Sequence, residues 1–464
     1  MLKKGARMNH KPHKLTPTVL AALALLLAVA CIPAAMPAAT LLPTNIPISV
    51  PTSRVASTSA PTPTDTPVPL TIAPTSKPAE TPASTTTPTP MPGSLPEMFH
   101  LVALTDDVFG GIERLYGSPD GGLWAITGEG IARLEDGSWG LYLSEHTGKL
   151  AGIDGSGRVW VLGEDGSEIS AWDGAPSPDG APSGDGGAWT TYGADAGWVP
   201  FAESWDYYAS GGQSDALGRL WFATSQDVRV FDGERWIVFS PADMGMGPPM
   251  DEELDVVFSI VILESGAVWV GECEWGGPGP FGGRGVRWFD GSAWHGADSP
   301  VASGCATEIA EDGAGNVWVG VEENLWRYDP ASGAWAEFAP PEPPIDGRFG
   351  FLNSLAVDPS GDPWPMIVIC GGASCYGNIA LYHVHDGAWT QIGGVAEYDL
   401  QWGPFFGADG TPWVFWDGGV YRIAEDTPEL MVPLYARSVV KDGSGQVWFL
   451  AWYEGRDWLW MLDI

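Results

Sequence analysis

Most of the chain repeats one local pattern, a turn rich in Asp and Gly followed by a strand-like run that contains tryptophan. The stretch "EDGAGNVWVGVEENLWRYDPASGAW" (311–335) shows it as a turn, a strand around Trp318, a second strand, another glycine turn and Trp335. Asp-Gly pairs suit tight hairpins, because Gly accepts a positive φ and Asp bonds nearby backbone amides. Eight tryptophans anchor the pattern: Trp124, Trp160, Trp221, Trp269, Trp318, Trp364, Trp413 and Trp448.

The spacing of these anchors indicates a propeller. Successive anchors lie 36, 61, 48, 49, 46, 49 and 35 residues apart, near the length of a four-stranded blade. One four-stranded sheet cannot bury both of its faces, whereas sheets packed around an axis cover one another. The sequence therefore predicts an all-β fold, a β-propeller of eight four-stranded blades over residues 97–464. The number is seven if the second repeat, with its long insert, is irregular.

The two ends of this domain are expected to pair. The last repeat, "ARSVVKDGSGQVWFLAWYEGRDWLWMLDI" (436–464), stops after its third strand. The segment "MFHLVAL" (98–104) precedes the first repeat and has no place of its own. We therefore predict that 98–104 supplies the missing outer strand and latches the ring.

The N-terminal part of the chain predicts export. Residues 1–31 run from a basic start through an apolar stretch to "LAVAC", the layout of a secretory signal. The ending resembles a bacterial lipobox, which predicts lipidation of Cys31; an ordinary cleaved signal and an uncleaved anchor are the alternatives. Residues 32–96 are rich in Pro, Thr and Ser, a composition that predicts a disordered linker. The expected location is the extracytoplasmic face of a cell membrane, with a lipid anchor as the only membrane contact.

The charge of the chain narrows its partners. There are 58 Asp+Glu against 22 Lys+Arg, and five of the basic residues lie within the first 14 positions. Because no acid precedes residue 31, the rest carries 58 − (22 − 5) = 41 net negative charges. This sign repels phosphate backbones, so nucleic acid is not an expected partner.

Two repeats resemble a known family. The stretches "NVWVGVEENLWRYDPASGAW" and "RLWFATSQDVRVFDGERW" look like the two-component regulator propeller repeat. The resemblance implies a propeller related to the periplasmic sensors of membrane histidine kinases, which often recognise oligosaccharides. No kinase or DNA-binding segment follows Ile464 in this sequence, so signalling is not expected of it.

A ligand site is expected on one face of the disc. The long insertions fall between second and third strands or between blades, and these connections share one face. Long loops on a rigid scaffold are where binding is usually built. Aromatic rings and carboxylates there suit a sugar, although packing of the loops is the competing explanation. The predicted ligand-binding residues are Trp205, Tyr207, Trp275, Phe281, Tyr376, Glu272 and Glu274.

Four cysteines besides Cys31 suit disulfides in an exported chain. We expect the pairs Cys273–Cys305 and Cys370–Cys375 rather than the two other connectivities.

Motifs for cofactors and catalysis give no positive prediction. The stretch "GPGPFG" (277–282) fits GxGxxG, but its prolines and the missing helix argue against a dinucleotide. His383 and His385 share one strand face, but the sequence supplies no evident third ligand, so neither a metal nor a cofactor is expected. The sequence thus favours a non-enzymatic module that binds a glycan or an extracellular protein. The alternative is an extracytoplasmic lyase or hydrolase acting on a polysaccharide or small molecule.

Overall fold

The computed structural model describes residues 98–104, 108–118, 122–135, 137–143, 149–163, 166–173, 188–200, 210–248, 255–276, 279–343, 348–371, 374–397, 402–416, 418–453 and 456–464. All of them fall within one compact unit, Ser84–Ile464. The predicted signal, Cys31 and the predicted linker lie outside the described residues.

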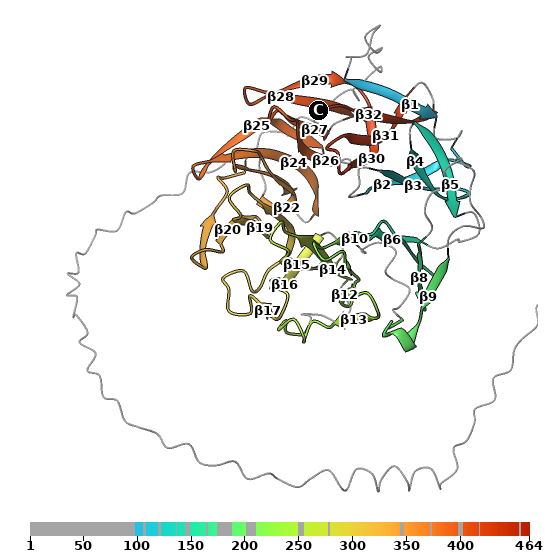
Figure 1. Cartoon of the computed structure of the whole chain (residues 1–464). Helices are drawn as coiled ribbons and strands as arrows, with labels where there is room; N and C mark the ends of the chain where they lie inside the picture. The colour runs from blue at the N-terminus through green and yellow to red at the C-terminus, as the bar shows by residue number, and fades with distance from the viewer. Residues whose placement is uncertain are drawn as a thin grey trace, which may run out of the picture. The chain divides into compact units, whose positions relative to one another are not determined.

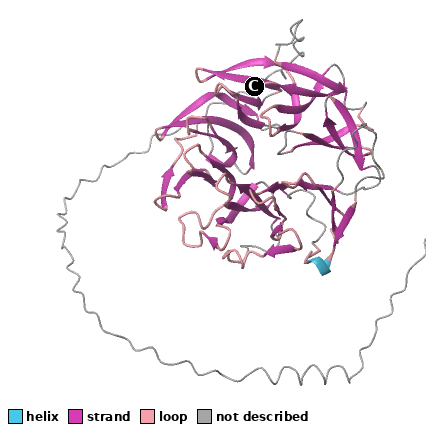
Figure 2. Ribbon diagram, viewed as in Figure 1, coloured by secondary structure: helices cyan, strands magenta, loops and turns pink. Residues whose placement is uncertain are grey.

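The described part of the chain is built from strands, which confirms the all-β prediction (Figure 2). One short 3-10 turn, Ala194–Ala196, interrupts them. Within these same residues no helix has the length and apolar character needed to cross a membrane. Figure 1 shows the sheets gathered around a common centre, which makes the fold propeller-like.

The strands fall into eight consecutive groups within the described residues, here called repeats 1 to 8, each with antiparallel neighbours. Repeats 1 to 4 comprise β2 (Ile112–Gly117), β3 (Leu123–Thr127), β4 (Gly130–Glu135), β5 (Ser138–Leu143); β6 (Lys149–Ile153), β7 (Val159–Leu162), β8 (Ile169–Trp172), β9 (Trp189–Tyr192); β10 (Ser210–Ser214), β11 (Leu220–Ala223), β12 (Val228–Phe231), β13 (Trp236–Phe239); and β14 (Asp255–Ile262), β15 (Val268–Gly276), β16 (Gly279–Phe289), β17 (Trp294–His295).

Repeats 5 to 8 comprise β18 (Ala306–Glu311), β19 (Val317–Val321), β20 (Asn324–Asp329), β21 (Ala334–Phe338); β22 (Arg348–Val357), β23 (Pro363–Gly371), β24 (Ser374–His385), β25 (Ala388–Glu397); β26 (Trp402–Phe406), β27 (Pro412–Trp416), β28 (Gly419–Ala424), β29 (Thr427–Val432); and β30 (Tyr435–Lys441), β31 (Val447–Tyr453), β32 (Arg456–Leu462) with β1 (Phe99–Leu104).

The domain's first strand joins its last repeat. β1 pairs antiparallel with β32, with Phe99 opposite Leu462, and completes the sheet β1-β32-β31-β30. Phe99 is buried against Trp413 of repeat 7. The segment 98–104 therefore occupies the outer position that the sequence predicted for it.

The eight anchor tryptophans all lie in the second strand of a repeat and are buried. Apolar clusters fill the space between neighbouring sheets, for example around Trp221 and Phe258 between repeats 3 and 4. A further cluster joins repeats 8 and 1 through Trp448, Leu450 and Leu123. Each sheet thus buries both faces against its neighbours, as the repeat pattern requires.

An aspartate holds the turn before the anchor in five repeats, and it is buried in four of them and half-buried in repeat 6. Asp154 accepts hydrogen bonds from the backbone amides of Ser156 and Arg158 through Oδ1, and from Trp160 Nε1 at 2.9 Å through Oδ2. The aspartate six residues before the anchor makes the same bond to the indole in the other four, as the pairs Asp215–Trp221, Asp312–Trp318, Asp358–Trp364 and Asp442–Trp448. These acids therefore satisfy buried donors and account for part of the acidic composition.

The first strands of the repeats lie innermost, where they contact one another and bond across sheets. Gln213 on β10 donates to the carbonyl of Ile260 on β14 and accepts from the amide of Ile262. β10 also pairs in parallel with β6 at Gly212 and Gly152, which joins repeats 2 and 3 into one eight-stranded sheet. A Cβ on Gly152 would lie 2.8 Å from Gly212 Cα, so only glycine permits this approach.

Candidate functional site

The strand connections fall on two opposite faces. Turns between strands one and two and between three and four form one, called the turn face. Hairpins between strands two and three and the links between repeats form the other, called the connection face. The sequence placed its ligand site on the connection face.

Two of the expected insertion loops are extensions of strands. β15 and β16 remain paired as far as Gly276 and Gly279, and β23 and β24 as far as Gly371 and Ser374. These strands have 9 to 12 residues, against 4 in β11 and β12. The inserted residues continue the ladder because it satisfies their backbone groups, and the result is two long hairpins on the connection face.

The predicted aromatic ligands are placed only in part. Trp275 and Phe281 belong to the β15–β16 hairpin and Tyr376 to β24, but their side chains are outside the described part of the structure. Trp205 and Tyr207 also lie outside the described residues. Their role in binding stays a prediction.

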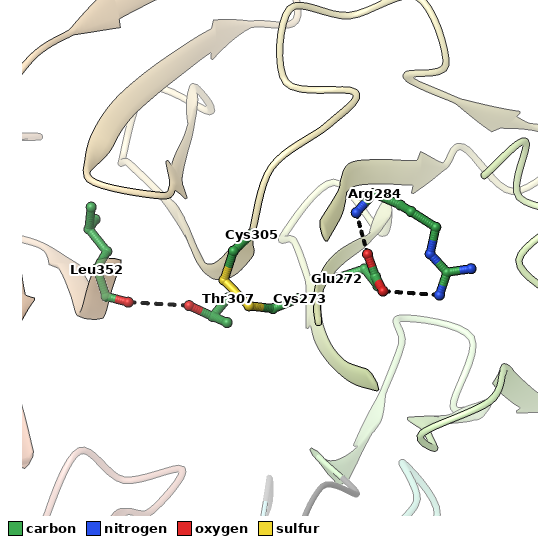
Figure 3. Close-up of a disulfide and its surroundings, with 6 residues drawn as sticks. All are labelled: Glu272, Cys273, Arg284, Cys305, Thr307 and Leu352. Carbon is green, nitrogen blue, oxygen red and sulfur yellow. Dashed lines mark hydrogen bonds and ion pairs between the residues drawn. A yellow bond between two sulfur atoms is a disulfide. The ribbon is translucent and has the colours of Figure 1, made fainter. Parts of the chain in front are cut away.

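The two predicted carboxylates, Glu272 and Glu274, are buried rather than exposed. Figure 3 shows Glu272 beside Arg284. Glu272 accepts hydrogen bonds from the backbone amide of Arg284 and, at 3.0 Å, from its guanidinium. Glu274 Oε1 lies 4.0 Å from Arg284 Nε. Burial raises the pKa of Glu272, with the Arg284 bonds acting against it. In this conformation both groups stabilise the hairpin and neither side chain reaches solvent.

A disulfide ties this hairpin to the next repeat (Figure 3). Cys273 on β15 is joined to Cys305, just before β18, the pair expected from the sequence. Next to it Thr307 donates to the carbonyl of Leu352 on β22. Cys370 is disulfide-bonded as well; the side chain of Cys375 lies outside the described residues, so that second pair stays a prediction.

One loop aromatic of the connection face is a packing residue. Trp198 is 1% exposed, and its Nε1 donates to the carbonyl of Gly166. Its ring packs on Trp236, and the guanidinium of Arg229 lies 4.5 Å from its centroid. This ring holds the link between repeats 2 and 3 in place.

Repeat 8 displays two rings that the sequence analysis did not select. Trp452 is 57% exposed and Tyr435 is 38% exposed. They are opposite one another on β31 and β30, and Trp452 is opposite Asp457 on β32. Directly opposite residues of antiparallel strands share a face of the sheet, so the three side chains form a row. Arg437 extends the row, with Nη2 3.0 Å from Asp457 Oδ2. We call these four residues the aromatic row.

The aromatic row continues a line of buried side chains on one face of β31. Trp448, Leu450 and Trp452 alternate along β31, and the first two are buried against repeat 1. Repeat 1 does not cover Trp452, because β31 has seven residues whereas β3, the matching strand of repeat 1, has five. The signal in the sequence was the unusual run "VWFLAWY", whose tryptophans cannot all be covered by a shorter neighbour.

The turn face carries a second group of chemically active residues, between repeats 6 and 7. His385 Nδ1 lies 2.6 Å from Asp362 Oδ2, and His383 Nε2 lies 3.6 Å from the same oxygen. His383 stacks on Trp364 with ring centroids 4.4 Å apart. Asp426 of repeat 7 approaches His383 Nδ1 to 4.0 Å.

The charges of this group affect its titration. The hydrogen bond to Asp362, and then the charge of that carboxylate, raise the pKa of His385. Burial would raise the pKa of Asp358, but hydrogen bonds from Ser360, Asp362 and Trp364 outweigh it and hold that pKa below its usual value.

A cavity of about 670 Å³ opens beside this group, between repeats 5 and 6. Its walls are the turn after Asp312, the turn that ends in Asp362, and the residues Asp386 and Gly387. Arg327 is also part of the lining. Asp362 thus belongs both to the cavity wall and to the histidine group, and the sequence analysis missed it as the third partner of the two histidines.

Comparisons with known proteins give only remote likenesses. No protein-family model and no curated protein matches the chain, so the resemblance of its repeats to two-component regulator propellers stays a prediction. A virginiamycin B lyase from Staphylococcus aureus is similar at 14% identity over 70% of this chain and 98% of its own, with a TM-score of 0.41. The extracellular domain of a putative one-component system from B. thetaiotaomicron is similar at 15% identity over 69% of this chain and 39% of its own, with a TM-score of 0.39.

PorZ, a surface component of the type-IX secretion system of Porphyromonas gingivalis, is similar at 16% identity over 76% of this chain and 56% of its own, with a TM-score of 0.37. The neighbours therefore include the extracellular domain of a one-component system and a bacterial surface component as well as a lyase. They are too remote to carry a function to this chain.

Proposed function

We propose that this protein is an exported, lipid-anchored β-propeller of eight blades, closed by β1, that binds a glycan through its connection face without catalysing a reaction. The aromatic row of repeat 8 carries the proposal. A tryptophan with more than half of its surface exposed costs hydration free energy, which a bound ligand would recover.

The chemistry of the row suits a sugar better than an apolar partner. Two rings side by side offer flat apolar surface for the C–H faces of a pyranose. Asp457 accepts and Arg437 donates hydrogen bonds at the edge of those rings, as hydroxyl groups require. Arg437 Nη2 also bonds the carbonyl of Ile112 at 3.2 Å, so the guanidinium is held in position before any ligand arrives.

The surrounding face supports binding at the same place. The link between repeats 8 and 1 includes Phe109, which packs on the cluster beneath Trp452, and Glu129 bonds its carbonyl. The two long hairpins of repeats 4 and 6 stand on the same face of the disc. A polymeric glycan that lies across the face could contact both regions, whereas a single sugar would occupy the row alone.

Affinity electrophoresis of the full chain in gels that contain soluble polysaccharides tests the proposal. Trp452→Ala should weaken binding about fivefold, since a stacked ring contributes about 1 kcal/mol beyond the area it buries. Leu217→Ala is the matched control, because Leu217 is the most exposed large apolar residue described and lies on the turn face. Its affinity should equal that of the wild type.

Three results would count against parts of the proposal. Unchanged affinity in Trp452→Ala would exclude the row while leaving glycan binding in place. Binding to a protein partner and to no polysaccharide would replace the ligand class. Release of shorter or unsaturated products from a bound polysaccharide would show the alternative, a lyase or hydrolase.

A further inference from the structure

Repeat 6 differs from repeats 2, 3 and 5 at one position of the turn before the anchor. Four residues after the turn aspartate, repeats 2, 3 and 5 have Arg158, Arg219 and Asn316. Each of these side chains donates to Oδ2 of its own turn aspartate, at 2.7, 2.6 and 2.8 Å. Repeat 6 has Asp362 at this position, which cannot donate to Asp358 when ionised and adds a second negative charge beside it.

The neighbouring strand, β24, differs from its counterparts in repeats 1 and 5 at the matching place. Arg133 and Arg327 lie opposite the anchors of repeats 1 and 5 and place a guanidinium over the indole. In repeat 6 the ring over the anchor Trp364 is that of His383 instead. Two further residues along β24, His385 reaches Asp362. Asp362 and His383 therefore stand where repeat 5 has the hydrogen-bond donors Asn316 and Arg327. His385 adds a third metal-binding side chain two residues further along the same strand.

The atoms of this group are arranged around one point. The oxygen of Asp362 and one ring nitrogen of each histidine all lie within 4.8 Å of one another. His383 Nε2 is enclosed by protein and has no hydrogen-bond partner among the described residues. A buried ring nitrogen without a partner costs free energy, which a bound ion would offset.

We propose that Asp362, His383 and His385 form a site for a divalent transition-metal ion of the zinc class. Two imidazoles with one carboxylate are a ligand set that zinc uses, at bond lengths of about 2.0–2.2 Å. Such bonds place neighbouring ligand atoms roughly 3.3 Å apart in a tetrahedron. The separation of 3.6 Å between His383 and Asp362 is close to this, and the separation of 2.6 Å to His385 must lengthen by a rotation of the exposed His385 ring.

Three protein ligands leave one coordination position. Asp426 lies on the adjacent turn of repeat 7, 4.0 Å from His383, and its side chain is half exposed. Its carboxylate is beside Nδ1 of His383, whereas Nε2 is the nitrogen that faces Asp362, so Asp426 contacts the histidine rather than the ion and the fourth position is left to water. The proposal is independent of the glycan-binding proposal, because this site is on the turn face and shares no residue with the aromatic row.

Calorimetric titration of the untagged full chain with ZnCl₂, in excess Mg²⁺ to occupy surface carboxylates, tests the site. The wild type should bind one ion per chain with a dissociation constant of micromolar or lower. His385→Ala and Asp362→Asn should each weaken binding by about 100-fold or more. His295→Ala is the matched control, since His295 makes the same kind of contact, 2.7 Å to Asp290, and no third candidate metal ligand joins this pair among the described residues.

Thermal unfolding supplies a second measurement that does not depend on the heat of binding. Zinc should raise the unfolding midpoint of the wild type and of His295→Ala, and should leave that of His385→Ala unchanged. Without zinc, the wild type and His385→Ala should unfold at similar temperatures, because the side chain of His385 is largely exposed. Absence of stoichiometric zinc binding in the wild type, or equal affinity in all variants, would overturn the proposal.

Discussion

Removing Asp154 tests whether the buried turn aspartates hold the repeats together. Its side chain is fully buried and accepts from two turn amides, from Arg158 Nε at 2.7 Å and from Trp160 Nε1 at 2.9 Å. Burial alone would raise the pKa of Asp154, but the bonds from Ser156 and Trp160 and the charge of Arg158 hold it below its usual value. The carboxylate is therefore the form that stabilises the fold.

The expected loss follows from these partners. In Asp154→Ala the indole N–H of Trp160 stays buried without an acceptor, which costs about 1–3 kcal/mol. The turn amides reach water and lose less, roughly 0.5 kcal/mol each, and the part-exposed contact with Arg158 adds a similar amount. The sum is about 3 kcal/mol. Asp154→Asn should lose more than half of this, because an amide cannot accept on both of its ends.

Urea unfolding followed by tryptophan fluorescence measures the loss. Asp232→Ala is the control: Asp232 accepts from the amides of Glu234 and Arg235 in an exposed hairpin, and no indole bonds it among the described residues. It should cost less than about 1 kcal/mol. The reasoning fails if both alanine variants lower the urea midpoint equally. The native pKa of Asp154 also predicts that its contribution is present above pH 4 and lost as the pH falls through that lower pKa.

Three further predictions concern single features of the fold. Replacing both Cys273 and Cys305 by Ser should lower the free energy of unfolding by about 3–4 kcal/mol, since the bridge closes a loop of 32 residues, and an unchanged urea midpoint would contradict this. Burial raises the pKa of Glu308, part-buried on the innermost strand β18, to about 8. Stability should therefore fall, by up to about 4–5 kcal/mol, as the pH rises from 4.5 to 8, because the unfolded chain releases this proton first. Glu308→Gln should remove that slope, and an identical slope would refute the assignment. Deletion of residues 98–104 should cost several kcal/mol through the loss of buried Phe99 and of the β1–β32 ladder, whereas deletion of 84–90 should cost none; equal melting curves would count against the latch.

The candidate sites differ in how far the sequence could predict them. The loop-rich face was chosen from insertion lengths, and the lengths were read correctly, but the inserted residues at Trp275 and Cys370 continue strands instead of forming loops. Glu272 looked like a surface acid, because nothing local shows that Arg284, twelve residues later, folds back to pair with it. The sequence did not distinguish the exposed Trp452 from the buried tryptophans, since its exposure depends on the length of a strand in another repeat.

The sequence by itself determined the local structure of each repeat, that is, its turns, its strands and the positions of its buried tryptophans. The turn aspartates, the glycines and the anchor tryptophans act within a few residues of one another, so their spacing was enough to predict an all-β, propeller-like fold and the strand at 98–104 that pairs with β32. Only the tertiary structure decided which side chains meet between strands and between sheets. Asp362 precedes β23 and meets His383 and His385 of the neighbouring strand β24, and Trp452 is exposed because the neighbouring sheet is shorter. Such contacts depend on register and on relative strand length, and these are fixed by packing rather than by any short stretch of sequence.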